Sequence, residues 1–357
     1  MRAPTVAAIT LHPTGGGIAV VSDLLWRVVR SRCDSRAQLL TMFDHESRPA
    51  TFAEKARFTA SLTGAQAFGR ADWILFTHLA LAKIQKAVPE RVRRPYAVFL
   101  HGIEAWNGLT AVEKEALARA DMRIANSTYT AARIAEAHPD IGPIEACPLA
   151  LQPSAEAPCR TERPAAYGPH MVLAVGRLSR SERYKGHDQL ISAWPAVVAR
   201  VPDARLVIAG AGDDADRLKE TANASSAANH IEFHGYVPTD ALDALYRSAA
   251  VFALPSRSEG FGLVYLEAMS HRLPCIGSIH DAARDVIADG RTGHLVDQDD
   301  IPGIADTIAS LLCDPDRRRR MGEAGYARLM SEFTFDRFTD RVCALLQRRF
   351  VAAVSAV

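Results

Sequence analysis

The sequence has no strong excess of either charge and no long apolar run. Its 357 residues include 42 basic and 41 acidic side chains, which gives a formal net charge of +1. A dedicated nucleic-acid binder would need a basic face to neutralise phosphates, so that class of partner is not expected. No stretch approaches the roughly 20 apolar residues that span a bilayer. We therefore expect a cytoplasmic protein, with peripheral contact at the inner face of the cytoplasmic membrane left open.

Cysteine is also sparse, and its six positions are scattered. No two cysteines form a Cys-x-x-Cys pair, so neither a zinc site nor a disulfide framework is indicated. The apolar run that follows the first residues ends in a glycine turn. This length suits a buried first strand better than a signal peptide.

Apolar runs of strand length alternate with amphipathic segments of helix length along the chain. In the first half, strands are expected at 5–11, 37–43, 73–79, 96–102, 122–127 and, as a sixth candidate, 144–150. In the second half, they are expected at 171–178, 204–210, 231–237, 251–256 and 274–278. Continuous apolar runs are typical of strands that helices cover on both faces. The pattern predicts an α/β protein with two doubly wound, parallel, Rossmann-like sheets.

A segment of linker composition separates the two halves. Residues 151–170 hold four prolines and show no helical or strand period. We predict a first domain over 1–155, a linker over 156–169 and a second domain over 170–334. The last periodic segment, 335–357, is predicted to be a helix. Ligands of doubly wound sheets bind outside the carboxyl ends of the strands, so functional residues are expected there.

In the first half, three glycines at positions 15–17 follow the first strand and open a helical segment. Such a turn offers N–H groups to an anion, although a tight turn without a ligand is the alternative. The spacing does not fit Gly-x-Gly-x-x-Gly, which disfavours a dinucleotide. His101 and His78 end two later strands. His101, which a glycine follows, is the stronger functional candidate, but each could be a core histidine bonded to backbone.

In the second half, two cations flank the loop that follows the strand at 171–178. Arg177 and Lys185 suit an anionic leaving group, because charge-assisted hydrogen bonds contribute roughly 1.5–3 kcal/mol each. Glycines beside both residues allow a ligand to approach closely. The alternative is that these side chains are only solvated.

The stretch SRSEGFGLVYLEAM, from Ser256 to Met269, places a glutamate on either side of a glycine turn. A helix is predicted from about Leu263 to His271, with Glu267 about one turn inside it. Its unpaired N–H groups would suit a phosphate, and the two carboxylates could accept hydroxyl hydrogen bonds at both ends of one ligand. A phosphate between two polyols describes a nucleotide sugar. The alternative is that the glutamates favour the helix dipole.

In this order, the motifs VGRL, YKG, SEGFGLVYLEAM and DGRTGHLV resemble the C-terminal, donor-binding domain of the retaining glycosyltransferases of family 4. The N-terminal glycine loop and HGIEAW resemble that family's acceptor-side domain, so the likeness covers nearly the whole chain. It implies the GT-B fold, with two facing Rossmann-like domains and a cleft between them. It also implies that the C-terminal helix crosses back to the first domain, and that the protein needs no metal or other cofactor.

The resemblance also implies individual roles. Arg177 and Lys185 would hold and stabilise the departing diphosphate, Glu259 would contact the sugar hydroxyls and Glu267 the ribose. His101 would lie beside the transferred sugar. The backbone amides implied to contact phosphate are those of Gly16, Gly17, Gly262 and Leu263.

The reaction implied is the transfer of a hexose, such as mannose or glucose, from GDP-mannose or a UDP-hexose with retention of configuration. The acceptor would be a hydroxyl of a saccharide or lipid-linked saccharide, in polysaccharide or glycoconjugate biosynthesis. Glu259 as a glycosidase-like nucleophile is the disfavoured mechanism. A nucleotide-sugar epimerase of the same fold and a non-catalytic nucleotide-sugar-binding protein are the rival functions.

Three further segments bear on these predictions. Residues 277–285 lack the glycine pair that the family often has, since Asp281 and Ala282 stand there, and this leaves donor identity open. Residues 52–70 mix phenylalanines with basic side chains and could touch a membrane, although a packed helix is favoured. Asp214 and Asp216 resemble a D-x-D metal motif but are expected to cap a helix.

Overall fold

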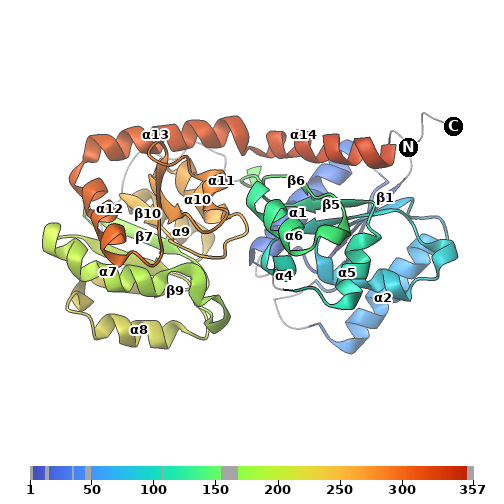
Figure 1. The fold of residues 1–357 in the computed structure, drawn as a ribbon, viewed down its shortest axis with the longest axis horizontal. Coiled ribbons are helices and arrows are strands. Elements are labelled where there is room, and N and C mark those ends of the chain that lie inside the picture. Colours follow the sequence, from blue (N-terminus) through green and yellow to red (C-terminus); the bar gives the residue numbers. More distant parts are fainter. Residues whose placement is uncertain are drawn as a thin grey trace. The chain divides into compact units, whose positions relative to one another are not determined.

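The computed structural model describes residues 3–12, 16–33, 36–44, 50–106, 108–153 and 168–351. Contacts divide the chain into two compact units (Figure 1). Unit 1 comprises Met1–Gln152 and Phe335–Val357, and unit 2 comprises Pro153–Thr334. The C-terminal segment therefore belongs to the first unit, although it follows the second in the sequence.

Unit 1 contains a six-stranded parallel sheet in the order β2-β1-β3-β4-β5-β6. Its strands are β1 (Pro4–Ala8), β2 (Gln38–Thr41), β3 (Trp73–Phe76), β4 (Tyr96–Leu100), β5 (Met122–Ala125) and β6 (Glu145–Ala146). All residues of β1, β3, β4 and β5 are buried, as expected for strands covered on both faces. The direction in which strands are added reverses between β1 and β3.

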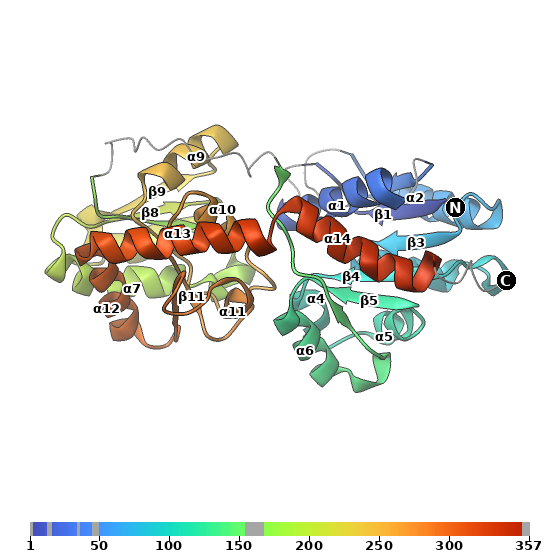
Figure 2. The ribbon, with the colours of Figure 1, turned by 90° about the horizontal axis from the view of Figure 1, so that it is seen from above.

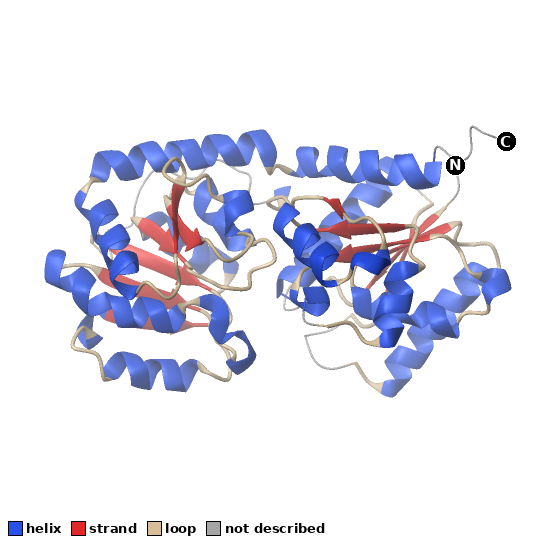
Figure 3. Cartoon of the chain, in the orientation of Figure 1, coloured by secondary structure: helices blue, strands red, loops and turns tan. Residues whose placement is uncertain are grey.

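Helices cover both faces of this sheet (Figure 3). They are α1 (Gly16–Val28), η2 (Val29–Cys33), α2 (Phe52–Ala67), α3 (Leu79–Ala82), η3 (Lys83–Ala87), η4 (Glu90–Val92), α4 (Ile103–Trp106), α5 (Ala111–Ala118), α6 (Thr128–Ala137), η5 (Pro139–Ile141), α14 (Phe335–Leu346) and η10 (Gln347–Val351). Thr51 starts α2 with a capping box that includes Glu54, and Thr110 starts α5 in the same way with Glu113.

Within unit 1, the C-terminal helix α14 packs against α1 (Figure 2). Arg341 Nη2 donates a hydrogen bond of 2.9 Å to the carbonyl oxygen of Pro148. Beyond the helix, the rings of Phe350 and Trp73 stack with centroids 4.8 Å apart. These contacts attach the end of the chain to the first sheet.

Unit 2 contains a second six-stranded parallel sheet, in the order β12-β11-β10-β7-β8-β9. Its strands are β7 (Met171–Val175), β8 (Arg205–Ala209), β9 (Ile231–Gly235), β10 (Val251–Ala253), β11 (Cys275–Ser278) and β12 (Gly293–Val296). The order reverses between β7 and β10. The strand β12 was not predicted, because it is a short edge strand whose two central residues are half-exposed and form no continuous apolar run.

The helices of unit 2 are η8 (Arg180–Lys185), α7 (His187–Arg200), α8 (Ala215–Asn223), η9 (Ala228–His230), α9 (Thr239–Ser248), α10 (Leu263–Ser270), α11 (Ala283–Val286), α12 (Ile301–Cys313) and α13 (Pro315–Glu332). One hydrophobic cluster joins α7 and α12 to the sheet, with Trp194 fully buried in it. In the described ranges, no helix combines the length and the apolar character that crossing a bilayer requires.

Candidate functional site

The loops that follow β7 and β10 meet at the point where the strand order of unit 2 reverses. β7 and β10 are neighbours in the sheet, yet successive strands extend from them in opposite directions. Ligands of doubly wound sheets bind at such a point, outside the carboxyl ends of the strands. Arg177 and Lys185 follow β7, and Glu259 follows β10. The topology therefore gathers three of the residues that the sequence analysis selected.

These side chains form one chain of ion pairs. Lys185 Nζ lies 2.9 Å from Glu259 Oε2 and 3.7 Å from Glu182 Oε2, and Glu182 also pairs with Arg177. The Lys185 side chain is only 12% exposed, whereas that of Arg177 is 71% exposed. The ammonium group is thus enclosed between carboxylates, while the guanidinium can reach a ligand from solvent.

Lys185 keeps its charge in this enclosed position. Burial acts to lower the pKa of its ammonium group, but the nearby negative charge, with Glu259 contributing most, outweighs burial and raises the pKa to about 12. At neutral pH the ammonium group of Lys185 is therefore charged. Because its side chain is enclosed, water screens its interaction with an anion less than it would at the surface.

A glycine allows the two loops to come this close. Gly186, directly after Lys185, has φ +87°, and a Cβ atom there would lie 2.4 Å from the carbonyl oxygen of Pro255. The side-chain amide of Gln298 then ties the loops together, since its Nε2 donates to Tyr184 O at 2.8 Å and to Pro255 O at 2.7 Å. The sequence analysis had assigned Gly186 a role in the approach of a ligand. The structure shows that its lack of a side chain is needed for the approach of the neighbouring loop.

The helix α10 begins beside this cluster, at Leu263 as predicted. Gly262 precedes it in a left-handed conformation, with φ +86°, and a Cβ atom there would lie 2.5 Å from the ring of Tyr265. Tyr265 is itself fixed by a hydrogen bond of 2.6 Å from its hydroxyl group to Leu254 O. The first N–H groups of a helix have no partner within it, so this end can donate hydrogen bonds to an anion.

Asp281 fixes the backbone at Glu259. Its Oδ2 accepts a hydrogen bond of 3.1 Å from Glu259 N, and its Oδ1 accepts one of 2.9 Å from Ala283 N. Ala282 N donates to Glu259 O at 3.1 Å. Burial is the main cause that raises the pKa of Asp281 to about 7, and the charge of Glu259 adds to it. Asp281, which stands where the family often has a glycine, thus holds the backbone of Glu259 in place.

Glu267 takes part in a different set of contacts. It lies on α10, where its Oε2 accepts a hydrogen bond of 2.8 Å from the hydroxyl group of Tyr246 on α9. Burial raises the pKa of its carboxyl group. Tyr246 stacks on His271, whose Nε2 lies 2.8 Å from an oxygen of Asp243. Glu267 is therefore positioned by α9, and Glu259 by the loop before α11.

In unit 1, His101 is held by backbone. Its Nε2 lies 2.7 Å from the carbonyl oxygen of Thr77, which only accepts, so Nε2 carries the hydrogen and Nδ1 is the acceptor in the neutral ring. Its ring stacks on His78 with centroids 5.6 Å apart. Burial, followed by the charge of His101, lowers the pKa of His78 to about 4. His78 is therefore neutral at physiological pH, and its Nδ1 accepts from Ala80 N at the start of α3.

Gly16 and Gly17 form the first residues of α1. Gly16 has φ +66°, a conformation that favours glycine, and a Cβ atom at either position would have no atom of the described residues within 4 Å. Gly15 lies outside the described residues. The predicted phosphate contact at the amides of Gly16 and Gly17 stays a prediction.

Two acidic residues differ from the sequence-based interpretation. Glu182, which bridges Arg177 and Lys185, was missed, although its place three residues before Lys185 on one helical turn could have indicated the pair. Asp214 was expected to cap α8, but its side chain makes no cap hydrogen bond. It pairs instead with Arg183 at 2.7 Å and Arg217 at 2.6 Å. Among the described residues, no three His, Cys, Asp or Glu side chains come together as a metal site requires.

Comparisons with known proteins identify relatives of both units. A family model described as glycosyl transferases group 1 matches residues 160–328. The GDP-mannose-dependent alpha-(1-6)-phosphatidylinositol monomannoside mannosyltransferase of Mycolicibacterium smegmatis is 34% identical over 239 residues, which are 63% of this chain and 63% of that protein. The protein of the same name from Mycobacterium tuberculosis H37Rv is 31% identical over 265 residues, 69% of this chain and 68% of that one.

Solved structures match over nearly the whole chain. Sucrose-phosphate synthase from Thermosynechococcus elongatus has a TM-score of 0.80 at 20% identity, covering 98% of this chain and all of that one. Anabaena HepE in complex with UDP has a TM-score of 0.77 at 17% identity, with the same coverage. At such low identity these likenesses bear on the fold alone, and they confirm the predicted GT-B fold.

Proposed function

This chain belongs to the group 1 glycosyl transferases, and we propose that it is a retaining, metal-independent hexosyltransferase that uses GDP-mannose. The observation that carries the proposal is the enclosed ammonium group of Lys185, 2.9 Å from Glu259 at the strand-order reversal of unit 2. The choice of GDP-mannose rests on the printed names of the two mycobacterial relatives. A UDP-hexose is the alternative donor, since the sequence leaves the base of the nucleotide open.

The residues of unit 2 divide the donor between them. Lys185 and Arg177 bind the diphosphate. Its negative charge takes the place of part of the charge that Glu182 and Glu259 supply to Lys185 in the free protein. The amides of Gly262 and Leu263 donate to the same phosphates from the start of α10. Glu259 accepts hydrogen bonds from the hexose hydroxyls and Glu267 from the ribose. These roles are the ones that the family resemblance implies, and the charge and hydrogen-bonding capacity of each group are compatible with them.

The chemistry is a displacement at the anomeric carbon with retention. The bond from this carbon to the diphosphate oxygen breaks, and a bond to the acceptor oxygen forms on the same face of the sugar. The acceptor hydroxyl proton passes to the departing diphosphate. Negative charge grows on the diphosphate as it leaves, so the fixed cations stabilise the transition state more than the ground state. No metal is required for this stabilisation.

Unit 1 supplies the acceptor side. We assign to His101 the recognition of a sugar hydroxyl, because Nδ1 is its hydrogen-bond acceptor once Nε2–H is used by Thr77 O. Gly16 and Gly17, the first residues of α1, retain the proposed phosphate contact. The acceptor is proposed to be a saccharide or a lipid-linked saccharide, and the protein is proposed to be cytoplasmic.

Peripheral membrane contact through α2 is a second, separable part of the proposal. Phe52 is 88% exposed at one end of this helix and Phe68 is 81% exposed at the other, whereas Phe58 is buried in the core. We expect the double variant Phe52→Ser, Phe68→Ser to lose at least half of the binding to anionic lipid vesicles in a sedimentation assay. Equal binding of wild type and variant would exclude α2 as the contact.

The donor assignment is tested by thermal stability with a panel of nucleotides and nucleotide sugars. A ligand that binds only the folded state stabilises it by RT ln(1 + [L]/Kd), about 2.7 kcal/mol at a hundredfold excess over Kd. We expect GDP and GDP-mannose to raise the unfolding temperature of the wild type, and Lys185→Ala to abolish this shift. A larger shift with UDP compounds would show that the donor carries uridine and not guanosine, and the proposed donor site would stand. If no nucleotide stabilised the folded wild type, the proposed function would be wrong.

A further inference from the structure

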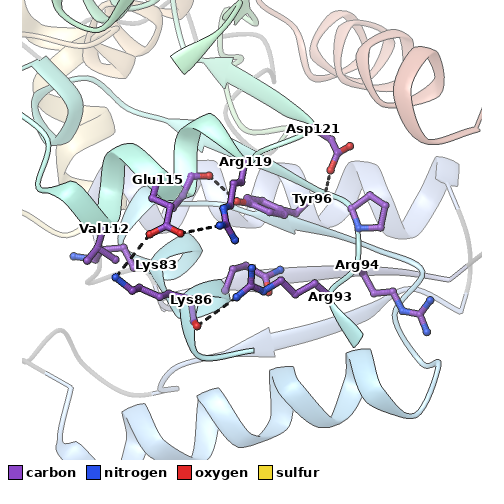
Figure 4. A pocket seen from close by; sticks show the side chains of 12 residues that line it. Lys83, Lys86, Arg93, Arg94, Tyr96, Val112, Glu115, Arg119 and Asp121 are labelled. Carbon is purple, nitrogen blue, oxygen red and sulfur yellow. Dashed lines mark hydrogen bonds and ion pairs between the residues drawn. The ribbon is translucent and has the colours of Figure 1, made fainter. Parts of the chain in front are cut away.

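Unit 1 contains a cavity of about 270 Å³ (Figure 4). It lies at the amino end of strand β4, whose first residue, Tyr96, lines it, and His101 follows the carboxyl end of that strand. Helix α5 and the segment 83–95 supply most of the remaining lining. The cavity therefore lies apart from the strand ends at which the family reaction is proposed to occur.

Cations outnumber carboxylates around this cavity. The lining contains five cationic side chains, which we call the cationic rim: Lys83, Lys86, Arg93, Arg94 and Arg119. Only two carboxylates line the cavity, those of Glu115 and Asp121. Three of the five cations are arginines, whose planar fork of donors matches a phosphate or carboxylate group.

The carboxylates near the rim are shared or engaged elsewhere. Glu115 lies between Lys86, at 3.7 Å, and Arg119, at 3.2 Å (Figure 4). Asp121 accepts from Tyr96 N at 3.1 Å and pairs with Arg349 at 2.8 Å. Outside the lining, Glu113 pairs with Lys83 at 3.0 Å, while the exposed Glu90 is shared by Arg93 and Arg119 at 3.4 and 3.3 Å.

Most of these pairs involve exposed side chains, and such pairs are individually weak. A dianion entering the cavity could therefore recruit Lys86 and Arg119 without breaking a strong interaction. Arg93 and Arg94, by contrast, also donate to backbone carbonyl oxygens. A bidentate contact with an arginine is stronger than the single, solvent-exposed contacts that it would replace. The arrangement favours a ligand with more than one negative charge on one group.

A buried amide gives an independent indication of a ligand. Gln85 also lines the cavity and is 4% exposed, and its Oε1 accepts a hydrogen bond of 3.2 Å from Gln66. Its Nε2 is buried and has no hydrogen-bond partner among the described residues. Buried donors are almost always satisfied in folded proteins. An acceptor oxygen of a bound molecule would satisfy this one.

The rest of the cavity is apolar. Pro95, Val112, Ala116 and the ring of Tyr96 form this part of the lining. The Tyr96 hydroxyl group is already used, because it donates at 2.6 Å to Ala116 O. A cavity with a cationic rim and an apolar floor suits an anionic head with an apolar group attached.

We propose that this cavity binds a small phosphate monoester with an apolar substituent, at a site separate from the donor site. The head contacts Lys86, Arg119 and the Gln85 amide, and the substituent lies against Tyr96 and Val112. Such a head is present both in soluble organic phosphates and in the headgroup of phosphatidic acid. The test below distinguishes these two sources.

The test measures binding of phenyl phosphate and of inorganic phosphate by calorimetry, with GDP present in excess to occupy the donor site. We expect phenyl phosphate to bind more tightly than inorganic phosphate. The double variant Lys86→Gln, Arg119→Gln should weaken its binding at least tenfold. Lys114→Gln is the matched control, since Lys114 lies on α5, which ends directly before Arg119, and it pairs with Asp140 at 3.2 Å without lining the cavity. It should leave binding unchanged.

Vesicles of phosphatidylcholine with and without phosphatidic acid identify the source. If the wild type binds the acidic vesicles, the double variant does not, and phenyl phosphate competes with the vesicles, the ligand of the cavity is a lipid headgroup. Binding of phenyl phosphate without such vesicle binding assigns a soluble ligand. The proposal is wrong if phenyl phosphate does not bind saturably, or if it binds the double variant and the wild type equally. The single variant Gln85→Leu gives a second test, with weaker binding expected while all five rim cations remain.

Discussion

Replacing Lys185 by glutamine is expected to lower kcat/KM for the nucleotide-sugar donor by at least about 100-fold. Removing one preorganised donor that faces a developing negative charge typically costs 10²–10³ in rate, or about 2.7–4 kcal/mol. The Lys185 side chain is enclosed and its pKa is raised to about 12, so the ammonium group is charged at neutral pH, whereas glutamine carries no charge. Initial-rate kinetics with varied donor concentration measure the effect.

Lys219→Gln is the matched control for this variant. Lys219 also faces a carboxylate, Asp216 at 3.8 Å, but it is 51% exposed on α8. Its replacement should change kcat/KM less than twofold, and thermal melting should confirm that both variants fold. If Lys185→Gln folded and retained activity within about fivefold of the wild type, Lys185 would not be the group that stabilises the diphosphate. The family assignment would survive that result, because it rests on the sequence relatives.

The sheets were predictable from the sequence because burial on both faces leaves a direct signal. Strands such as β3 and β4 are apolar at nearly every position, as is typical of strands covered on both faces. The edge strand β12 gives no such signal, since it is covered less completely. The other edge strands, β2, β6 and β9, lie within predicted strands, so β12 is the exception among the edges.

The candidate site was predictable where a residue type and a topological position coincide. Arg177, Lys185 and Glu259 follow the ends of predicted parallel strands, where ligands of doubly wound sheets bind. The strand order, which makes two of these strands neighbours, comes from the structure. Glu182 and the backbone role of Asp281 were not accessible in this way. Their contacts depend on which loop atoms meet in space, and periodicity carries no information on that. The roles assigned to the site residues stay predictions until the variants are measured.

Gly186→Ala is expected to destabilise unit 2 by roughly 3 kcal/mol or more and to lower transferase activity at the same time. Two costs add in this variant. An alanine with φ near +87° is strained by about 1–3 kcal/mol. Its Cβ atom would also lie 2.4 Å from Pro255 O, and since that atom belongs to the backbone, no side-chain rotation can relieve the clash. Denaturant unfolding of wild type and variant measures the difference.

Gly290→Ala separates these two costs. Gly290 also has a left-handed conformation, with φ +71°, but a Cβ atom there would have no atom within 4 Å. It should lose only the conformational part, about 1–3 kcal/mol, and should keep its activity. In Gly186→Ala the loops after β7 and β10 have to move apart, which lengthens the 2.9 Å contact between Lys185 and Glu259. Equal destabilisation by the two substitutions would show that the loops can yield at no cost, and the close packing at Gly186 would then not be what positions Lys185.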